Sequence, residues 1–235
     1  MAVGAYFLFF LKNYIRSHRY LREIVLILIF HIFFWGFLYS KEPEAEIWVV
    51  FGTLCLLLNL VTVPSIFLLE KGNSLYFGLI RKSGRINFFL SKFLLILLID
   101  FFWILIFSVI YGLRFLDMHY FHLLIPRLTL MLLLMILSIS ILSLFFSHKP
   151  WLVWILMLLI VFGSIINKTA LFPIHAIQEF YIFFSFCLPP ILEIIFSTAT
   201  LDFSFWRVIF LCIAFIQITF YFILNIKFIS LKDFL

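Results

Sequence analysis

Long runs of apolar residues with few charges most strongly limit what this chain can fold into. One such run is the segment 24–40, IVLILIFHIFFWGFLYS. A helix of about 20 apolar residues crosses a bilayer core about 30 Å thick. Hydrophobic residues make up 66% of the 235 residues and charged residues 12%, whereas soluble domains average about 45–50% and about 25%. A soluble core cannot bury so much apolar surface, so we expect an all-α integral membrane protein with a single transmembrane domain, 1–235.

Six segments are predicted to be transmembrane helices. They are about 24–40, 47–69, 93–113, 124–146, the stretch from the HKPW turn to Ile166, and about 206–226. The acidic sequence KEPEAE follows the first crossing, and its proline, Pro43, ends the helix.

Basic residues divide unevenly between the two sides that these crossings define. Twelve of the 17 fall on one side: Lys12, Arg16, Arg19, Arg22, Lys71, Arg81, Lys82, Arg85, Lys92, Lys149, Lys227 and Lys232. The other side keeps Lys41, Arg114, Arg127, Lys168 and Arg207. Because cytoplasmic loops are rich in Lys and Arg, we predict that the N- and C-termini are cytoplasmic.

The connector 170–205 contains a segment, 176–198, that is apolar enough to span but carries Pro189 and Pro190 near its middle and Glu179 and Glu193 near its ends. A seventh crossing here would export Lys227 and Lys232, against the positive-inside tendency. We therefore predict a re-entrant hairpin that dips into the outer leaflet before the last crossing. Non-helical backbone at that depth is tolerated only where protein or a water-filled cavity covers it, so the hairpin should pack against other helices.

The segment 5–22 has the pattern of an N-terminal interfacial helix. Lys12, Arg16 and Arg19 follow at spacings of four and three, which places them on one face of a helix. Apolar residues line another face: Leu8, Leu11 and Ile15. Such a helix lies on the membrane surface. The alternative is a basic flank of the first crossing.

A few polar residues interrupt the predicted crossings. Asp100 lies between LLILLI and FFWILIF, where an ionised carboxylate costs about 2.5–3.5 kcal/mol on insertion scales. Its candidate neighbours are Asn59 and Gln217, and the three residues either line a translocation path or join the helices. Arg127 is expected to extend to the headgroups at the outer end of the fourth crossing.

Motifs for nucleotide binding or catalysis are missing. A phosphate-binding G-x-x-x-x-G-K-[ST] loop is absent, because Lys82-Ser83 and Lys168-Thr169 lack the preceding glycine. Neither an H-E-x-x-H sequence nor a serine–histidine pair for proteolysis is present. The net charge of +6 fits the basic flanks of membrane helices. We expect no enzyme activity, no metal or cofactor held by this chain, and no nucleic-acid partner.

The polar segment 70–92 is predicted to be a cytoplasmic loop that contains a short helix. Its apolar side holds Leu75 and Leu79, and its basic side holds Arg81, Lys82 and Arg85. This pattern suggests a docking element for a soluble partner. A membrane-surface loop of mixed character is the simpler alternative.

In this segment the sequence resembles the type-2 ABC exporter permeases, transmembrane subunits that have no ATPase domain of their own. The matching residues are Glu70, Gly72, Leu75 and Leu79, then a basic turn, and Lys92 at the start of the third crossing. Ser83-Gly84 stands where that family often has a proline, and the acidic outer loop is unusually short. The order of interfacial helix, six crossings, cytoplasmic loop and hairpin is also similar.

The resemblance implies that the 70–92 segment is an ATPase-coupling element made of Glu70, Gly72, Leu75, Leu79, Arg81, Lys82 and Arg85. It also implies that the chain is a membrane-spanning permease subunit of an ATP-driven exporter. The subunit would pair as a homodimer or with a second permease, and membrane lipids would surround it. ATP and Mg²⁺ would then be bound and hydrolysed by a separate cytoplasmic ABC ATPase. A lipid-like or other amphipathic cargo is expected.

Three alternatives remain at this stage. The E-x-G-x-S-L run at Glu70 is also similar to the haem-exporter B subunit of cytochrome c maturation. A membrane-embedded enzyme acting on lipid would need Asp100, Glu179, Glu193 and His175 to converge. A non-transporting scaffold would need only a closed helix bundle.

Overall fold

The computed structural model describes residues 2–39, 46–67, 82–148 and 188–231, and its regular structure there is entirely helical. The helices are α1 (Ala2–Arg16), α2 (Tyr20–Phe33), α3 (Trp35–Leu38), α4 (Ile47–Phe67), α6 (Lys82–Phe115), α7 (Met118–His148), α10 (Ile191–Thr200) and α11 (Phe205–Leu231). Four helices, α4, α6, α7 and α11, are long and apolar enough to cross a membrane. The chain is therefore an all-helical, multi-pass membrane protein. The predicted fifth crossing lies outside the described residues.

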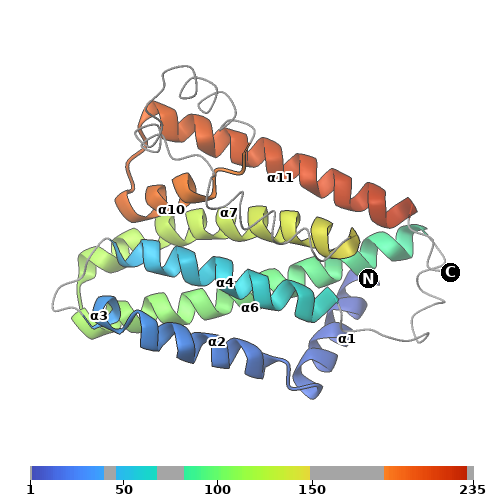
Figure 1. Ribbon diagram of the computed structural model, residues 1–235, viewed down its shortest axis with the longest axis horizontal. Coiled ribbons are helices and arrows are strands. Elements are labelled where there is room, and N and C mark those ends of the chain that lie inside the picture. The colour runs from blue at the N-terminus through green and yellow to red at the C-terminus, as the bar shows by residue number, and fades with distance from the viewer. Residues whose placement is uncertain (1, 40–45, 68–81, 149–187, 232–235) are drawn as a thin grey trace.

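The long helices lie side by side, and α1 crosses them steeply at one end (Figure 1). This end, called the α1 end below, also holds the last turns of α4 and the first turns of α6. The opposite end holds α3 and α10 and is called the α10 end. Consequently α2 and α6 run from the α1 end to the α10 end, whereas α4, α7 and α11 run back.

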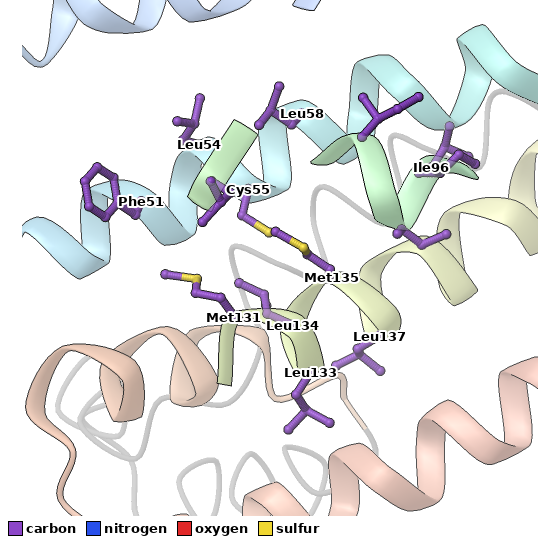
Figure 2. Close-up of a cluster of buried hydrophobic side chains, with 14 of the residues drawn as sticks. Phe51, Leu54, Cys55, Leu58, Ile96, Met131, Leu133, Leu134, Met135 and Leu137 are labelled. Carbon is purple, nitrogen blue, oxygen red and sulfur yellow. The ribbon is translucent and has the colours of Figure 1, made fainter. Parts of the chain in front are cut away.

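The centre of the bundle is the contact between α4 and α7. Figure 2 shows Cys55 of α4 facing Met131, Leu134 and Met135 of α7, and all of these side chains are fully buried. Lipid tails are as apolar as these side chains, so the hydrophobic effect does not drive the contact within a bilayer. Close packing of the side chains stabilises it instead. Further helices add to this pair: α2 and α10 pack on α4, and α6 and α11 pack on α7.

The prediction of one interfacial helix over 5–22 is wrong in its boundary. Helix α1 ends at Arg16, and α2 begins at Tyr20. Between them His18 has a positive φ of 53°, a conformation that no helix contains. On α1, Leu8 and Ile15 of the expected apolar face are more than half exposed on the surface of the bundle, while Phe10 and Tyr14 are buried. Across this corner, Tyr14 of α1 donates a hydrogen bond to Glu23 of α2.

Helix α6 is longer than the predicted third crossing and begins at Lys82. Residues 82–92 of the predicted coupling loop are therefore its first turns. A polar helical extension is stable there because a helix satisfies its own backbone hydrogen bonds whether or not lipid surrounds it. The predicted first crossing corresponds to α2 and α3, which are separated at Phe34.

Short helix α10 returns from within the bundle to the α10 end. It begins directly after Pro190, and just before it Gln217 Nε2 donates to the Leu188 carbonyl at 3.1 Å. Because Gln217 lies near the middle of α11, the start of α10 lies at mid-depth. Leu201, in the left-handed conformation, then ends the helix. Residues 170–187 of the predicted hairpin lie outside the described part of the chain.

Candidate functional site

The last carbonyl groups of α4 are bound by two basic side chains from other elements. Arg19, in the corner between α1 and α2, donates from Nη1 to the Ser65 carbonyl. Lys92 of α6 donates from Nζ to the Phe67 carbonyl at 3.4 Å. A helix C-terminus carries unsatisfied carbonyls and partial negative charge, so cations are stabilising there. We call the residues around this contact the α4-exit cluster: Phe10, Arg19, Ser65, Phe67, Phe88 and Lys92.

The ammonium group of Lys92 is enclosed by aromatic rings. Only 2% of this residue is exposed, and its Nζ lies 5.1, 5.7 and 4.4 Å from the ring centroids of Phe10, Phe67 and Phe88. Aromatic faces attract a cation, more strongly when it is desolvated. The contacts come from α1, α4 and α6, so Lys92 connects three elements at the point where α4 leads into the 68–81 segment.

The predicted coupling residues lie at or beyond this point. Glu70, Gly72, Leu75, Leu79 and Arg81 are outside the described residues. Lys82 opens α6, and Arg85 lies partly buried in its first turns. Their proposed role therefore remains a prediction.

The predicted basic face of the interfacial helix is divided between two environments. Lys12 and Arg16 are exposed on α1, in accordance with an interfacial position. Arg19 instead lies beyond the end of α1 and binds α4. Sequence periodicity assigned all three to one face because it assumed that the helix continued through His18.

Two acidic side chains are fully buried near the α1 end. Glu23 of α2 accepts hydrogen bonds at Oε2 from the Tyr14 hydroxyl and from Trp103 Nε1, the latter at 3.3 Å. Asp100 of α6 pairs at Oδ2 with Thr62 Oγ1 of α4 at 2.8 Å. Burial, and then the bond to Glu23, raise the pKa of the Tyr14 hydroxyl, which therefore stays protonated and remains a donor.

Sequence reasoning identified Asp100 but overlooked Glu23. The available signal was position, since Glu23 directly precedes the apolar run of the first crossing. The burial of Glu23 depends on α1 folding back so that Tyr14 reaches it, which periodicity does not reveal.

The predicted trio of Asn59, Asp100 and Gln217 does not share one hydrogen-bond network. Asn59 Nδ2 donates to Ser138 of α7, whereas Asp100 pairs with Thr62 and Gln217 binds Leu188. Each contact joins a different pair of segments. A translocation path lined by all three remains a prediction. The contacts of Asn59 and Asp100 are interhelical hydrogen bonds, and Gln217 binds the segment just before α10.

Arg127 does not extend to the headgroups as expected. Only 8% of it is exposed, its guanidinium lies 5.3 Å from the Trp48 ring centroid, and Nη2 donates to the Ala199 carbonyl at 3.4 Å. The C-terminal end of α10 carries partial negative charge and therefore stabilises this cation. The expectation is wrong because α10 covers this part of α7.

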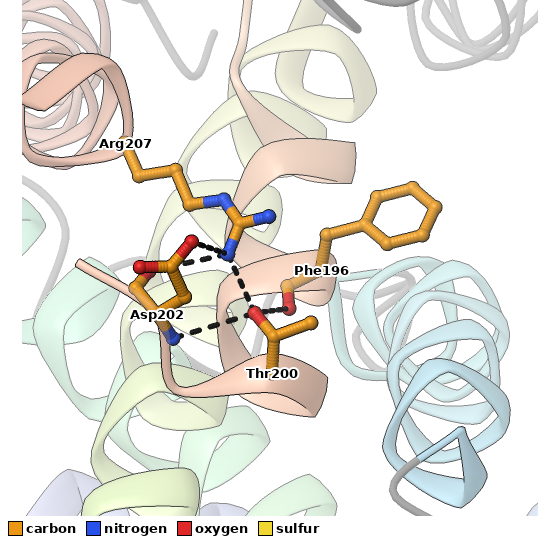
Figure 3. A network of polar contacts seen from close by, with 4 residues as sticks. All are labelled: Phe196, Thr200, Asp202 and Arg207. Atoms are coloured by element: carbon orange, nitrogen blue, oxygen red, sulfur yellow. Dashed lines mark hydrogen bonds and ion pairs between the residues drawn. The ribbon is translucent and has the colours of Figure 1, made fainter. Parts of the chain in front are cut away.

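The turn after α10 contains a polar network around Arg207 (Figure 3). Arg207 Nη1 donates to Thr200 Oγ1 at 2.6 Å and lies 3.1 Å from Asp202 Oδ2. Thr200 Oγ1 in turn donates to the Phe196 carbonyl at 3.0 Å. The network connects α10 to the start of α11.

Described residues line at least two cavities on the bundle surface. An apolar groove of about 500 Å³ lies between α1, α6 and α7, lined in part by Phe7, Leu97 and Phe101. A pocket of about 180 Å³ at the α10 end is lined in part by His31 and Arg114. Among the described residues, no three His, Cys, Asp or Glu side chains gather closely enough to hold a metal ion.

The residues required by the lipid-enzyme alternative are only partly described. Asp100 is bonded to α4, and Glu193 lies in the first turn of α10. Glu179 and His175 are outside the described residues. No protein-family model, curated protein or solved structure matches the chain.

Proposed function

We propose that this chain is the membrane-spanning permease subunit of an ATP-driven exporter. ATP and Mg²⁺ are bound by a separate cytoplasmic ABC ATPase, and two permeases pair in a bacterial cytoplasmic membrane. The cargo is lipid-like or otherwise amphipathic. Four apolar helices long enough to span a bilayer support a multi-pass subunit of this kind.

The α4-exit cluster is the observation that carries the proposal. It joins the α1–α2 corner, the end of α4 and the start of α6 through Arg19 and Lys92. A force applied to the 70–92 segment would therefore reach three elements at once. In this proposal the α1 end is cytoplasmic, and ATP-driven closure of the ATPases moves the joined helices as a rigid body.

The proposed topology has six crossings. Helices α2 and α3 form the first, while α4, α6, α7 and α11 form the second, third, fourth and sixth. The fifth falls within 149–187. Helix α10 is the returning limb of the outer hairpin, a role supported by the contact between Gln217 and Leu188 at mid-depth.

Co-purification tests the partner. A tagged chain extracted in mild detergent should retain a soluble ATPase that hydrolyses ATP. The charge reversals Glu70→Arg and Arg85→Glu together should abolish coupling between the two proteins. Absence of any ATPase from the mildly extracted complex would remove the main support for the proposal.

Substitution of Lys92 tests the α4-exit cluster. Hydrogen bonds to charged groups contribute about 1.5–3 kcal/mol, so Lys92→Met should reduce the effect of the permease on the ATPase rate by about tenfold or more. The matched control is Lys12→Met, which removes an exposed ammonium from α1. Equal ATPase rates for both variants, at equal melting temperature, would contradict the coupling role.

A further inference from the structure

The hydroxyl oxygen of Thr62 lies within hydrogen-bond distance of two other oxygen atoms, and each of these contacts needs a hydrogen. Its Oγ1 lies 2.9 Å from the Leu58 carbonyl oxygen and 2.8 Å from Asp100 Oδ2. A threonine hydroxyl has one hydrogen to donate and can accept two others, whereas a backbone carbonyl only accepts. Both contacts are full hydrogen bonds if Thr62 donates to Leu58 and Asp100 donates to Thr62. That arrangement requires a proton on Asp100.

The surroundings of Asp100 favour the same protonation state. The residue is 0% exposed, and within the described chain no basic side chain forms an ion pair with it. Its Oδ1 has no hydrogen-bond partner there. An ionised carboxylate in that position would lose its hydration without replacement, at a cost of several kcal/mol.

A second carboxyl group increases this cost. Glu23, also 0% exposed, is close enough to Asp100 to interact electrostatically, and Tyr14 interacts with both. Glu23 Oε2 already accepts two hydrogen bonds, so this oxygen needs no hydrogen of its own. Two neighbouring carboxylates in an apolar site do not both ionise readily.

The described groups that contact the pair or interact with it electrostatically come from α1, α4 and α6. Tyr14 of α1 and Trp103 of α6 donate to Glu23, and Cys55 of α4 interacts electrostatically with Asp100. Two cations at this end, Arg19 and Lys92, bind α4 carbonyls.

We propose that Glu23 and Asp100 form a proton-binding site within the membrane part of the bundle, with the proton on Asp100 Oδ2 and donated to Thr62. The ligand is a proton, and the site connects α2, α4 and α6. Release of the proton would leave two carboxylates in one apolar environment, where they repel each other. The bound proton therefore keeps α2, α4 and α6 together. The inference does not depend on the exporter proposal.

Infrared difference spectroscopy of the purified chain in lipid nanodiscs tests this assignment directly. The carbonyl stretch of a protonated carboxylic acid is separate from the carboxylate bands. Asp100→Asn should remove an acid band at neutral pH, and the asparagine amide can still donate to Thr62. The matched control is Asp202→Asn, whose carboxylate is 60% exposed and paired with Arg207; it should remove only carboxylate absorption.

The two carboxyl groups are distinguished by one more variant. Glu23→Gln should leave the acid band in place. If Glu23→Gln removes that band while Asp100→Asn does not, the proton is not on Asp100 and the assignment is overturned. Loss of only a carboxylate band in Asp100→Asn would overturn it as well.

The pH dependence of stability provides an independent measurement. A proton held by the folded protein but not by the unfolded chain makes stability fall as the pH rises. The melting temperature of the wild-type chain should therefore decline as the pH rises above about 4, where an unfolded aspartate ionises, and that of Asp100→Asn should decline less. Parallel curves for the two proteins would contradict the proposal.

Discussion

Arginine side chains at the α10 end bind the C-terminal ends of helices. Arg114 donates from Nη1 to the Leu38 carbonyl at 2.6 Å and from Nη2 to that of Tyr39 at 3.2 Å, at the end of α3. Arg127 binds the end of α10 in the same way. These residues are exceptions to the charge asymmetry of the sequence. Their positive charge is used locally, because helix C-termini are partially negative.

At the residue scale, Asn59 and Ser138 should be energetically coupled. Asn59 Nδ2 donates to Ser138 Oγ across the α4–α7 contact, and interhelical hydrogen bonds in membranes contribute about 0.6 kcal/mol, up to about 1.7. A double-mutant cycle of Asn59→Ala and Ser138→Ala, measured by unfolding in mixed micelles, should give a coupling energy in that range. The control is a second cycle that combines Asn59→Ala with Thr219→Ala. Thr219 is an exposed residue of α11 whose described hydrogen bond lies within its own helix, so this coupling energy should be close to zero.

At the scale of elements, Gly52 allows α10 to approach α4 closely. A Cβ atom at this position would lie 2.8 Å from Ile195 Cγ1 and 2.9 Å from Cγ2. These carbons are attached directly to the Ile195 Cβ and cannot all move aside. Gly52→Ala should therefore destabilise the protein by about 1–3 kcal/mol, seen as a lower melting temperature.

The control for this prediction is Gly36→Ala. A Cβ at Gly36 would meet nothing within 4 Å, and alanine is the better helix former, so stability should be unchanged or slightly higher. Adding Ile195→Ala to Gly52→Ala should cost less than the sum of the single changes. Additive effects would mean that the two residues do not limit the α4–α10 contact.

The turn between α6 and α7 contains backbone strain at Leu116, whose φ is 50°. This residue is 75% exposed, so its side chain contributes little packing. Glycine adopts a positive φ without steric cost, and Leu116→Gly should raise stability by up to about 1 kcal/mol. Leu113→Gly, at a site within α6 that is more than half exposed, should instead lower it by about 1 kcal/mol. A lower melting temperature for both variants would contradict the view that the positive φ of Leu116 destabilises the protein.

At the scale of the whole molecule, the proposed topology places the two ends of the bundle on opposite sides of the membrane. In a cysteine-free background, Lys12→Cys marks the α1 end and Asp202→Cys the α10 end. A membrane-impermeant maleimide should label Asp202→Cys in intact cells and Lys12→Cys only after permeabilisation. The reverse pattern would show that the orientation is inverted, and labelling of both in intact cells would contradict opposite sides.

The sequence by itself determined the class of the protein and most of its long helices. Apolar runs of sufficient length predict α4, α6, α7 and α11 because a bilayer requires backbone groups to be satisfied within each crossing. Asp100 was also identifiable, since its cost within an apolar run depends on local composition alone.

Only the tertiary structure decided which polar groups meet. Thr62, rather than Asn59 or Gln217, reaches Asp100, and Tyr14 reaches Glu23 because the chain turns at His18. Arg127 is covered by α10 instead of meeting headgroups. Such contacts depend on how far each helix is rotated and shifted along its neighbour. Hydropathy and periodicity specify which face of a helix is polar but not which depth or partner that face meets.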